Sequence, residues 1–355
     1  MNYRAPFRLS GTVLVAALIL LNSSCGGQKS PTERAPAPSN PERALIMFYN
    51  VENLFDTIND PLTSDEEFLP GTNKDWNSKR YWKKITDLGE VISKADSLQL
   101  PDIVGLCEVE NAAVLEDLVS SETLASGNFG IIHRNGPDAR GIDVAAIYNK
   151  DNFKPKSMNF YTVTLKNSER PHTRQVLYIK GALFEEEIHC FVTHWPSRRG
   201  GAEESEHKRI QVAELIRSKV DSIQGTDDDA AIIIMGDFND YPNNRSVHET
   251  LGATDHYSGN GLCNLLYSEH ENGNGTYNYR GEWGVLDQFI VSVNIADPDR
   301  SVHTRVLFTK ILNFDWLLYH DEKFDDIKPS RTYGGPNYYG GYSDHLPILL
   351  ELEIH

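Results

Sequence analysis

The sequence predicts an α/β domain whose sheets are covered on both faces. Several predicted strands, such as AAIIIMG and DVAAIY, are apolar throughout rather than alternating, which is typical of strands buried on both sides. Two longer segments carry apolar residues every three or four positions, which indicates helices that cover a sheet. No internal repeat or second domain boundary is visible after the N-terminal region, so we expect one large domain over residues 44–355.

The first 24 residues are expected to be a signal peptide. Arg4 and Arg8 give a positive start, and the apolar segment 11–21 is shorter than the roughly 20 residues that span a bilayer. Small residues then lead to Cys25, as in a bacterial lipoprotein leader, in which the cysteine carries the lipid. A plain secretory signal is the alternative. We therefore expect an exported protein, anchored to a membrane through Cys25 (periplasmic or at the cell surface) and otherwise secreted.

Residues 25–43 are rich in proline, serine and charge and predict a disordered tether. The strands predicted beyond it, in chain order, are 44–49, 102–108, 129–133, 143–149, 176–184, 188–194, 231–236, 286–293, 302–308 and 346–353. The predicted helices are 76–98, 111–118 and 203–223. The glycine- and aspartate-rich loops 56–75 and 258–283 are expected to carry specificity.

Polar side chains stand at the ends of several of these apolar segments. A buried strand that ends in a carboxylate, amide or imidazole must provide that group with a hydrogen-bond, charge or metal partner. If these ends share one edge of a sheet, the side chains form a site for a hard cation and a phosphate. They are Asn50, Glu108, His194, Asp237 with Asn239, Asp287, and Asp344 with His345.

GDFND follows a buried strand that stops at Gly236, and Asp237 and Asn239 leave its end on the same side. A carboxylate and an amide in this spacing suit Mg²⁺, which prefers oxygen ligands. An ordinary Asx turn is about equally compatible with the motif. In SDHLP, Asp344 can hold a metal and His345 can act in acid–base chemistry, although a capped strand start is the alternative.

Two arginines and one further carboxylate, Asp143, complete the candidate set. Arg140 and Arg198 are the candidates for gripping substrate phosphate oxygens, since guanidinium groups bind them well. Asp143 could orient His194, or could form a surface ion pair with Arg140. Asp287 stands at a strand start, where it could orient His345.

Charge and cysteine content limit the partners. The net charge is −17, and loss of Arg4 and Arg8 with the leader leaves 32 basic residues against 51 acidic ones, a net of −19. Such a surface repels long polyanions, because nucleic-acid affinity comes mostly from neutralised phosphates. The cysteines show no zinc spacing. The balance favours a small or exposed phosphoester over duplex nucleic acid.

Taken together, FYNVEN, CEVE, THWPS, GDFN, LDQF and SDHLP resemble the signatures of the endonuclease/exonuclease/phosphatase superfamily, in that family's order, from residue 45 to 354. The surrounding sequence looks like the branch common in secreted proteins of Bacteroidetes-type bacteria. The resemblance implies a four-layer α/β sandwich: two facing mixed β-sheets with helices outside. It also implies a divalent metal, Mg²⁺ or Mn²⁺, near Asn50, Glu108 and Asp344.

The resemblance implies the remaining roles as well. Asp237 would position or deprotonate the attacking water with the help of Asn239, while His194 and His345 would contact the phosphate. We therefore expect a monomeric, metal-dependent phosphoesterase acting on a small-molecule, lipid or nucleic-acid phosphoester. An extracellular endonuclease on DNA or RNA is the alternative, and a non-catalytic, surface-anchored binding lipoprotein is an alternative of another class.

Overall fold

The computed structural model describes residues 41–355 except 167, 169–170, 301–302 and 323–324. The expected signal peptide, the lipid-carrying Cys25 and most of the tether lie outside the described residues. The last two tether residues already belong to the first strand, because Glu42 and Arg43 pair with the last strand of the chain. The Arg43 side chain also forms ion pairs with Asp96 and Glu351. Within the described residues, no helix is long and apolar enough to cross a membrane.

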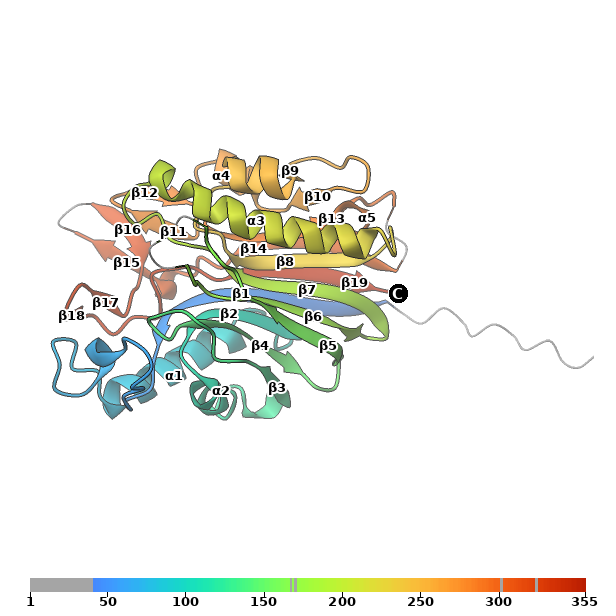
Figure 1. Cartoon of the computed structure of the whole chain (residues 1–355). Helices are drawn as coiled ribbons and strands as arrows, with labels where there is room; N and C mark the ends of the chain where they lie inside the picture. The colour runs from blue at the N-terminus through green and yellow to red at the C-terminus, as the bar shows by residue number, and fades with distance from the viewer. Residues whose placement is uncertain (1–40, 167, 169–170, 301–302, 323–324) are drawn as a thin grey trace, which may run out of the picture. The chain divides into compact units, whose positions relative to one another are not determined.

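Two mixed β-sheets form the centre of the fold (Figure 1). In the six-stranded sheet β1 runs parallel to β2, and in the seven-stranded sheet β7 runs parallel to β8. The first sheet has the order β14 (Thr304–Ile311), β19 (Ile348–Ile354), β1 (Glu42–Leu54), β2 (Ile103–Val109), β4 (Asp143–Asn149), β3 (Phe129–Ile132). The second has the order β5 (Phe153–Tyr161), β6 (Val176–Leu183), β7 (Glu186–His194), β8 (Ala231–Asp237), β13 (Asp287–Ser292), β10 (Leu262–Asn264), β9 (Ala253–Thr254).

The alternation of side chains along β1 explains the layering. Ala44, Ile46 and Phe48 point into the core between the two sheets, while Leu45 and Met47 point to the opposite face, where helices cover them. Each fully buried large apolar side chain of these layers contributes about 2 kcal/mol to the free energy of folding. Both faces of the central strands are therefore apolar, as predicted.

The helices form the two outer layers. α1 (Ser78–Ser93) and α2 (Ala112–Val119) pack on the outer face of the first sheet, and α3 (Ala202–Gln224) covers β8 of the second. Two short helices, α4 (Tyr267–Glu271) and α5 (Val293–Ala296), lie near the edge of the second sheet. The four-layer α/β sandwich is confirmed.

Local signals set where the helices begin. Asn77 accepts hydrogen bonds from the backbone N–H groups of Lys79 and Arg80, so α1 begins at Ser78 rather than at the predicted residue 76. Trp76 packs in the core instead and donates to the carbonyl of Phe55. The apolar spacing of this helix predicts that Trp82 faces the core. This prediction is wrong, because the Trp82 side chain is 52% exposed.

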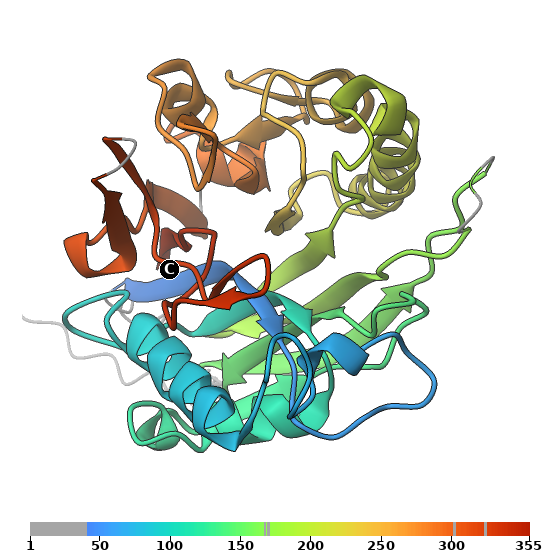
Figure 2. The ribbon, with the colours of Figure 1, turned by 90° about the vertical axis from the view of Figure 1, so that its left-hand side faces the viewer.

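Three small hairpins gather at one rim of the sandwich (Figures 1 and 2). They are β11 (Tyr277–Tyr279) with β12 (Glu282–Gly284), β15 (Leu318–Asp321) with β16 (Asp326–Pro329), and β17 (Tyr333–Gly334) with β18 (Asn337–Tyr338). The strand ends of β1, β2, β7 and β8 that carry the predicted polar residues lie at this rim.

Candidate active site

Asp237 stands at the centre of the site, at the end of β8. Its Oδ2 atom accepts a 3.1 Å hydrogen bond from Asn50 Nδ2, and Nε2 of His194 lies 3.5 Å from the same oxygen. Its Oδ1 atom accepts a 2.9 Å bond from the backbone N–H of Asn239. Strand ends 187 residues apart thus meet on one carboxylate, as the predicted convergence requires.

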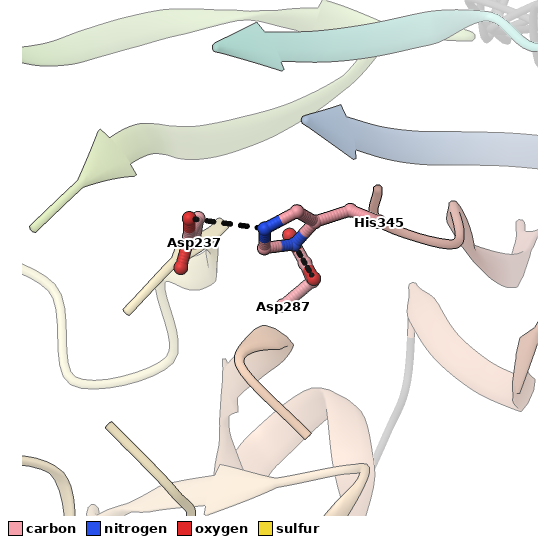
Figure 3. A group of neighbouring side chains, drawn as sticks. All are labelled: Asp237, Asp287 and His345. Carbon is pink, nitrogen blue, oxygen red and sulfur yellow. Dashed lines mark hydrogen bonds and ion pairs between the residues drawn. The ribbon is translucent and has the colours of Figure 1, made fainter. Parts of the chain in front are cut away.

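Asp287, at the start of β13, and His345, just before β19, lie beside Asp237 and complete the centre (Figure 3). Nδ1 of His345 donates to Asp287 Oδ2 at 2.7 Å, and Nε2 of the same ring lies 3.9 Å from Asp237 Oδ2. Tyr277 forms a β-bridge with His345 and packs its ring against the imidazole, with the centroids 4.8 Å apart. The imidazole is therefore fixed by a carboxylate on one side and by an aromatic ring on one face.

The two histidines of the site are driven to opposite charge states. Burial lowers the pKa of His345, but the Asp287 charge and hydrogen bond outweigh it, with Asp237 adding to them, and hold that pKa well above its usual value. Burial and the charges of Arg174 and Arg140 hold the pKa of His194 well below its usual value. At neutral pH the site thus contains one imidazolium, His345, and one neutral imidazole, His194.

Burial, with Asp287 and Glu108 adding and His345 opposing, raises the pKa of Asp237 to about 7. A carboxylate with such a pKa exchanges protons near neutral pH, which is where a general base works best. Its neighbours Asn50 and Asn239 fix its orientation without adding charge.

Two groups of side chains at the site could hold a cation, and the more compact one consists of two carboxylates and a histidine. The ligand atoms of Asp237, Asp287 and His345 all lie within 4.8 Å of one another, and Asp287 Oδ1 is buried without a hydrogen-bond partner. The predicted ligands Glu108 and Asp344 flank this group: Glu108 lies 4.0 Å from His194, and Asp344 pairs with Arg331 at 2.9 Å. They do not form an equally compact cluster among the described residues.

The backbone at the site is held in an unusual conformation. Glu52, Asn53, Glu108 and Asn239 all have positive φ angles of 50–65°, in the left-handed region that costs non-glycine residues about 1 kcal/mol or more each. A Cβ atom at Gly236 would lie 2.2 Å from the carbonyl oxygen of Thr193 in the paired strand, so only glycine fits there. Strain concentrated at these strand ends is typical of a functional site.

Asp143 does not orient His194, and this prediction is wrong. Its carboxylate accepts both of its hydrogen bonds from the backbone N–H of Gly136, at 3.0 and 3.1 Å, and lies 3.5 Å from His133. Nδ1 of His194 is buried without a hydrogen-bond partner. The Asp143 carboxylate is thus bound to the turn before β4. Without it, the partly buried N–H of Gly136 would have no acceptor, which costs free energy.

The two arginines differ in availability. Arg140 is half-exposed and pairs with Asp138 at 3.5 Å rather than with Asp143, so much of its guanidinium faces solvent. Arg198 donates to the carbonyl of Asn239 at 2.8 Å and packs over the ring of Tyr241 at 3.9 Å. Arg198 therefore holds the Asn239 turn, and its substrate-binding role stays a prediction.

Three charged residues near the site were not predicted. Glu52 is buried, and burial, then the Asp344 charge, raises its pKa to about 7. Lys84 of α1 is also buried and donates to Thr332 Oγ1 at 2.7 Å and to the carbonyl of Tyr342. Arg331 lies 3.6 Å from Glu52 and 2.9 Å from Asp344. The two cations compensate the carboxylates at this edge.

The family follows from this fold and site together with the sequence. The model of the Endonuclease/Exonuclease/phosphatase family matches residues 45–354, and the chain belongs to that family. The activities that the family name covers all cleave phosphoesters, so the protein is a phosphoester hydrolase. No curated protein matches the sequence.

Solved structures with the same fold share little sequence with this chain. An endonuclease/exonuclease/phosphatase family protein from Bacteroides thetaiotaomicron has a TM-score of 0.55 at 16% identity, over 89% of this chain and 96% of that one. A mannosyl-6-phosphatase of the same organism has a TM-score of 0.54 at 16% identity, over 87% and 99%. The humanized D. rerio TDP2 has a TM-score of 0.52 at 14% identity, over 87% and 98%. These likenesses establish the fold.

Proposed function

We propose that the protein hydrolyses a small phosphoester, a monoester or a diester, with the help of Mg²⁺ or Mn²⁺. The observation that carries this proposal is the arrangement of Asp237 between two histidines of opposite charge state. Phosphoryl transfer requires mainly positioning and charge stabilisation, and this arrangement supplies both.

Each residue then has a distinct task. Asp237 accepts a proton from the attacking water, since its pKa is raised to about 7 and Asn50 and Asn239 fix its orientation. The imidazolium of His345 stabilises negative charge that develops on the phosphate oxygens, and Asp287 keeps it protonated. His194, neutral and buried, directs its Nε2 at Asp237 Oδ2.

We propose that Asn50, Glu108 and Asp344 hold the cation, with Glu52 beside them. A cation among Asp237, Asp287 and His345 would have to displace the His345 proton, whereas the oxygen-only set needs no such displacement. A divalent ion bound there would act as a Lewis acid on a phosphate oxygen. Burial first, and then the charge of Asp344, raises the pKa of Glu52, and a cation bound at this edge would stabilise both carboxylates.

The substrate is proposed to be small because the surface is strongly acidic, with a net charge of −17. A nuclease acting on long DNA or RNA would need many neutralised phosphates, and its activity would fall steeply with salt. One similar structure is named a mannosyl-6-phosphatase, which fits a small phosphomonoester. A weak dependence of activity on salt would separate this proposal from the endonuclease alternative.

The test is an assay panel with and without chelator: bis-p-nitrophenyl phosphate, p-nitrophenyl phosphate, hexose 6-phosphates, plasmid DNA and sphingomyelin. We expect chelator-sensitive hydrolysis of at least one small substrate, abolished in Asp237→Ala and in His345→Ala. Unchanged turnover in both variants would defeat the assignment. A non-catalytic binding protein would hydrolyse nothing in the panel.

We also propose that the protein is exported, lipid-anchored through Cys25 and monomeric. The leader sequence and the proline-rich segment that follows it support the first two points. Cells fed radiolabelled palmitate should label the wild-type protein and leave Cys25→Ser unlabelled. An unlabelled wild-type protein released to the medium would point to a plain secretory signal instead. Light scattering of the mature protein tests the monomer.

A further inference from the structure

A cavity near the candidate site is lined by residues of the β15–β16 hairpin and of the β17–β18 segment. Its volume of about 410 Å³ falls in the range of ligand pockets in proteins. The residues that decide its chemistry are Tyr319, Asp321, Lys328, Arg331 and Tyr339. None of them takes part in the proton chemistry described above.

Arg331 joins this cavity to the reacting centre. Arg331 is one of the lining residues, and its Nη2 lies 2.9 Å from Asp344, the neighbour of His345 in the chain. Arg331 is therefore shared between the lining of the cavity and the ion pairs beside the reacting centre.

Two tyrosines give the cavity exposed aromatic walls. Tyr319 is 52% exposed and Tyr339 is 65% exposed, which is high for side chains of their size. Two contacts fix the position of Tyr339. Its backbone N–H donates to the carbonyl of Thr332 at 2.9 Å, and its ring packs directly on Gly334, where an added Cβ atom would lie only 2.5 Å from the ring. The fold thus holds an aromatic ring toward solvent at this place.

The polar part of the cavity offers one acceptor and one donor. Lys328 Nζ lies 2.6 Å from Asp321 Oδ2, across the hairpin, and 5.9 Å from the Tyr319 ring centroid. An ion pair next to an aromatic face suits hydroxyl groups, because each hydroxyl both donates and accepts a hydrogen bond.

We propose that this cavity binds the sugar ring of a sugar phosphoester, with the tyrosines against the ring face and Asp321 and Lys328 on its hydroxyls. This inference rests on the proposed phosphoesterase function and names its substrate class. Arg331 contacts the phosphate end of the same molecule.

A nucleobase is the competing ligand, since it also stacks on tyrosine. Its edge, however, has a fixed pattern of donors and acceptors that requires rigid partners. Asp321 and Lys328 stand on the paired strands β15 and β16 and neutralise each other's charge. The hydroxyl groups of a sugar can rotate to donate to Asp321 or to accept from Lys328, so they need no fixed pattern of partners. The cavity therefore favours a polyhydroxylated ring.

The test measures binding separately from turnover. Calorimetry on the inactive Asp237→Asn variant, with Mg²⁺ present, compares mannose 6-phosphate, glucose 6-phosphate and 5′-AMP. We expect at least one hexose phosphate to bind more tightly than 5′-AMP. In the same background, Tyr339→Ala should weaken that binding about tenfold and Tyr339→Phe should retain it.

Tyr257→Ala is the matched control, because Tyr257 is 51% exposed and lies outside the cavity lining. It should leave binding unchanged. Tighter binding of 5′-AMP, no binding of either hexose phosphate at about 1 mM, or equal effects of Tyr339→Ala and Tyr257→Ala would each overturn the sugar proposal. The proposed function fails separately, if no substrate of the assay panel shows chelator-sensitive hydrolysis.

Discussion

Asp287 and His345 are joined by a 2.7 Å hydrogen bond although 58 residues separate them in the chain. Asp287 opens β13 of one sheet, and His345 precedes β19 of the other. The bond therefore spans the two halves of the sandwich and sets the charge of the imidazole at the reacting centre.

The first prediction concerns this pair. Asp287→Asn removes the charge that keeps His345 protonated, so we expect kcat on p-nitrophenyl phosphate esters to fall about a hundredfold with little change in KM. The Asp287→Asn/His345→Ala double variant should be no worse than His345→Ala alone, because the two residues act as one unit. Additive losses would show that they act independently. Circular dichroism of each variant checks the fold.

The second prediction locates the cation. Ligand that binds only the folded state raises the melting temperature, so Mg²⁺ or Mn²⁺ should stabilise the chelator-treated protein. We expect Asp344→Asn to abolish that rise in melting temperature, because Asp344 belongs to the proposed oxygen-only set. Asp287→Asn should retain it. The reverse result would place the ion among Asp237, Asp287 and His345.

The third prediction concerns the buried cation Lys84, whose pKa burial lowers to about 8. Lys84→Met leaves Glu52 and Asp344 without its charge, and we expect the free energy of unfolding to fall by about 3 kcal/mol. Lys83→Met, on the same helix, removes only the more exposed pair with Asp87 and should cost less than about 1 kcal/mol.

Urea unfolding of both variants measures the difference. Adding Glu52→Gln to Lys84→Met should recover part of the loss, since it removes one uncompensated carboxylate. Equal stabilities of Lys84→Met and Lys83→Met would contradict a role for Lys84 in charge compensation.

The fourth prediction concerns acid stability. The Arg43 hydrogen bond lowers the pKa of Asp96 to about 2, below its unfolded value of about 3.9. A carboxyl group with a depressed folded pKa contributes stability above the unfolded value and loses it as the pH falls through the folded value. Arg43 is 31% exposed, so solvent screens the pair and the contribution is about 1 kcal/mol.

Asp96→Asn should therefore be less stable than the wild type at neutral pH, and the gap should close near pH 2. Urea unfolding at both pH values tests this. A gap of the same size at low pH would mean that the side chain acts through shape and hydrogen bonding rather than through charge.

The site residues at strand ends were the ones that the sequence predicted best. Asp237 and His194 follow long apolar segments, and a polar group after such a segment predicts a shared partner at the sheet edge. The pairing of β7 with β8 then places both at the same level of the sheet. This part of the geometry follows from strand periodicity and register alone.

Other residues carried no such signal. Glu52 has a positive φ angle and looks like part of an ordinary turn in the sequence, whereas Glu108, which also has a positive φ, was predicted because it ends an apolar segment. Lys84 resembles any lysine of an amphipathic helix, because its burial depends on Thr332 and Tyr342, which are distant in the chain. The strand β5 was missed because it is an edge strand with mostly exposed side chains and a proline within it.

The pairing of β1 with β19, from Glu42 opposite Ile354 to Phe48 opposite Ile348, has a consequence for biogenesis. The first strand to be synthesised stays without one of its neighbours until the last strand arrives, and that same final stretch delivers His345. A chain without this final stretch is thus expected to be inert, because it lacks both the strand that pairs with β1 and the imidazole of the reacting centre. Hydrolysis would begin only once the last strand has been synthesised and has paired with the first.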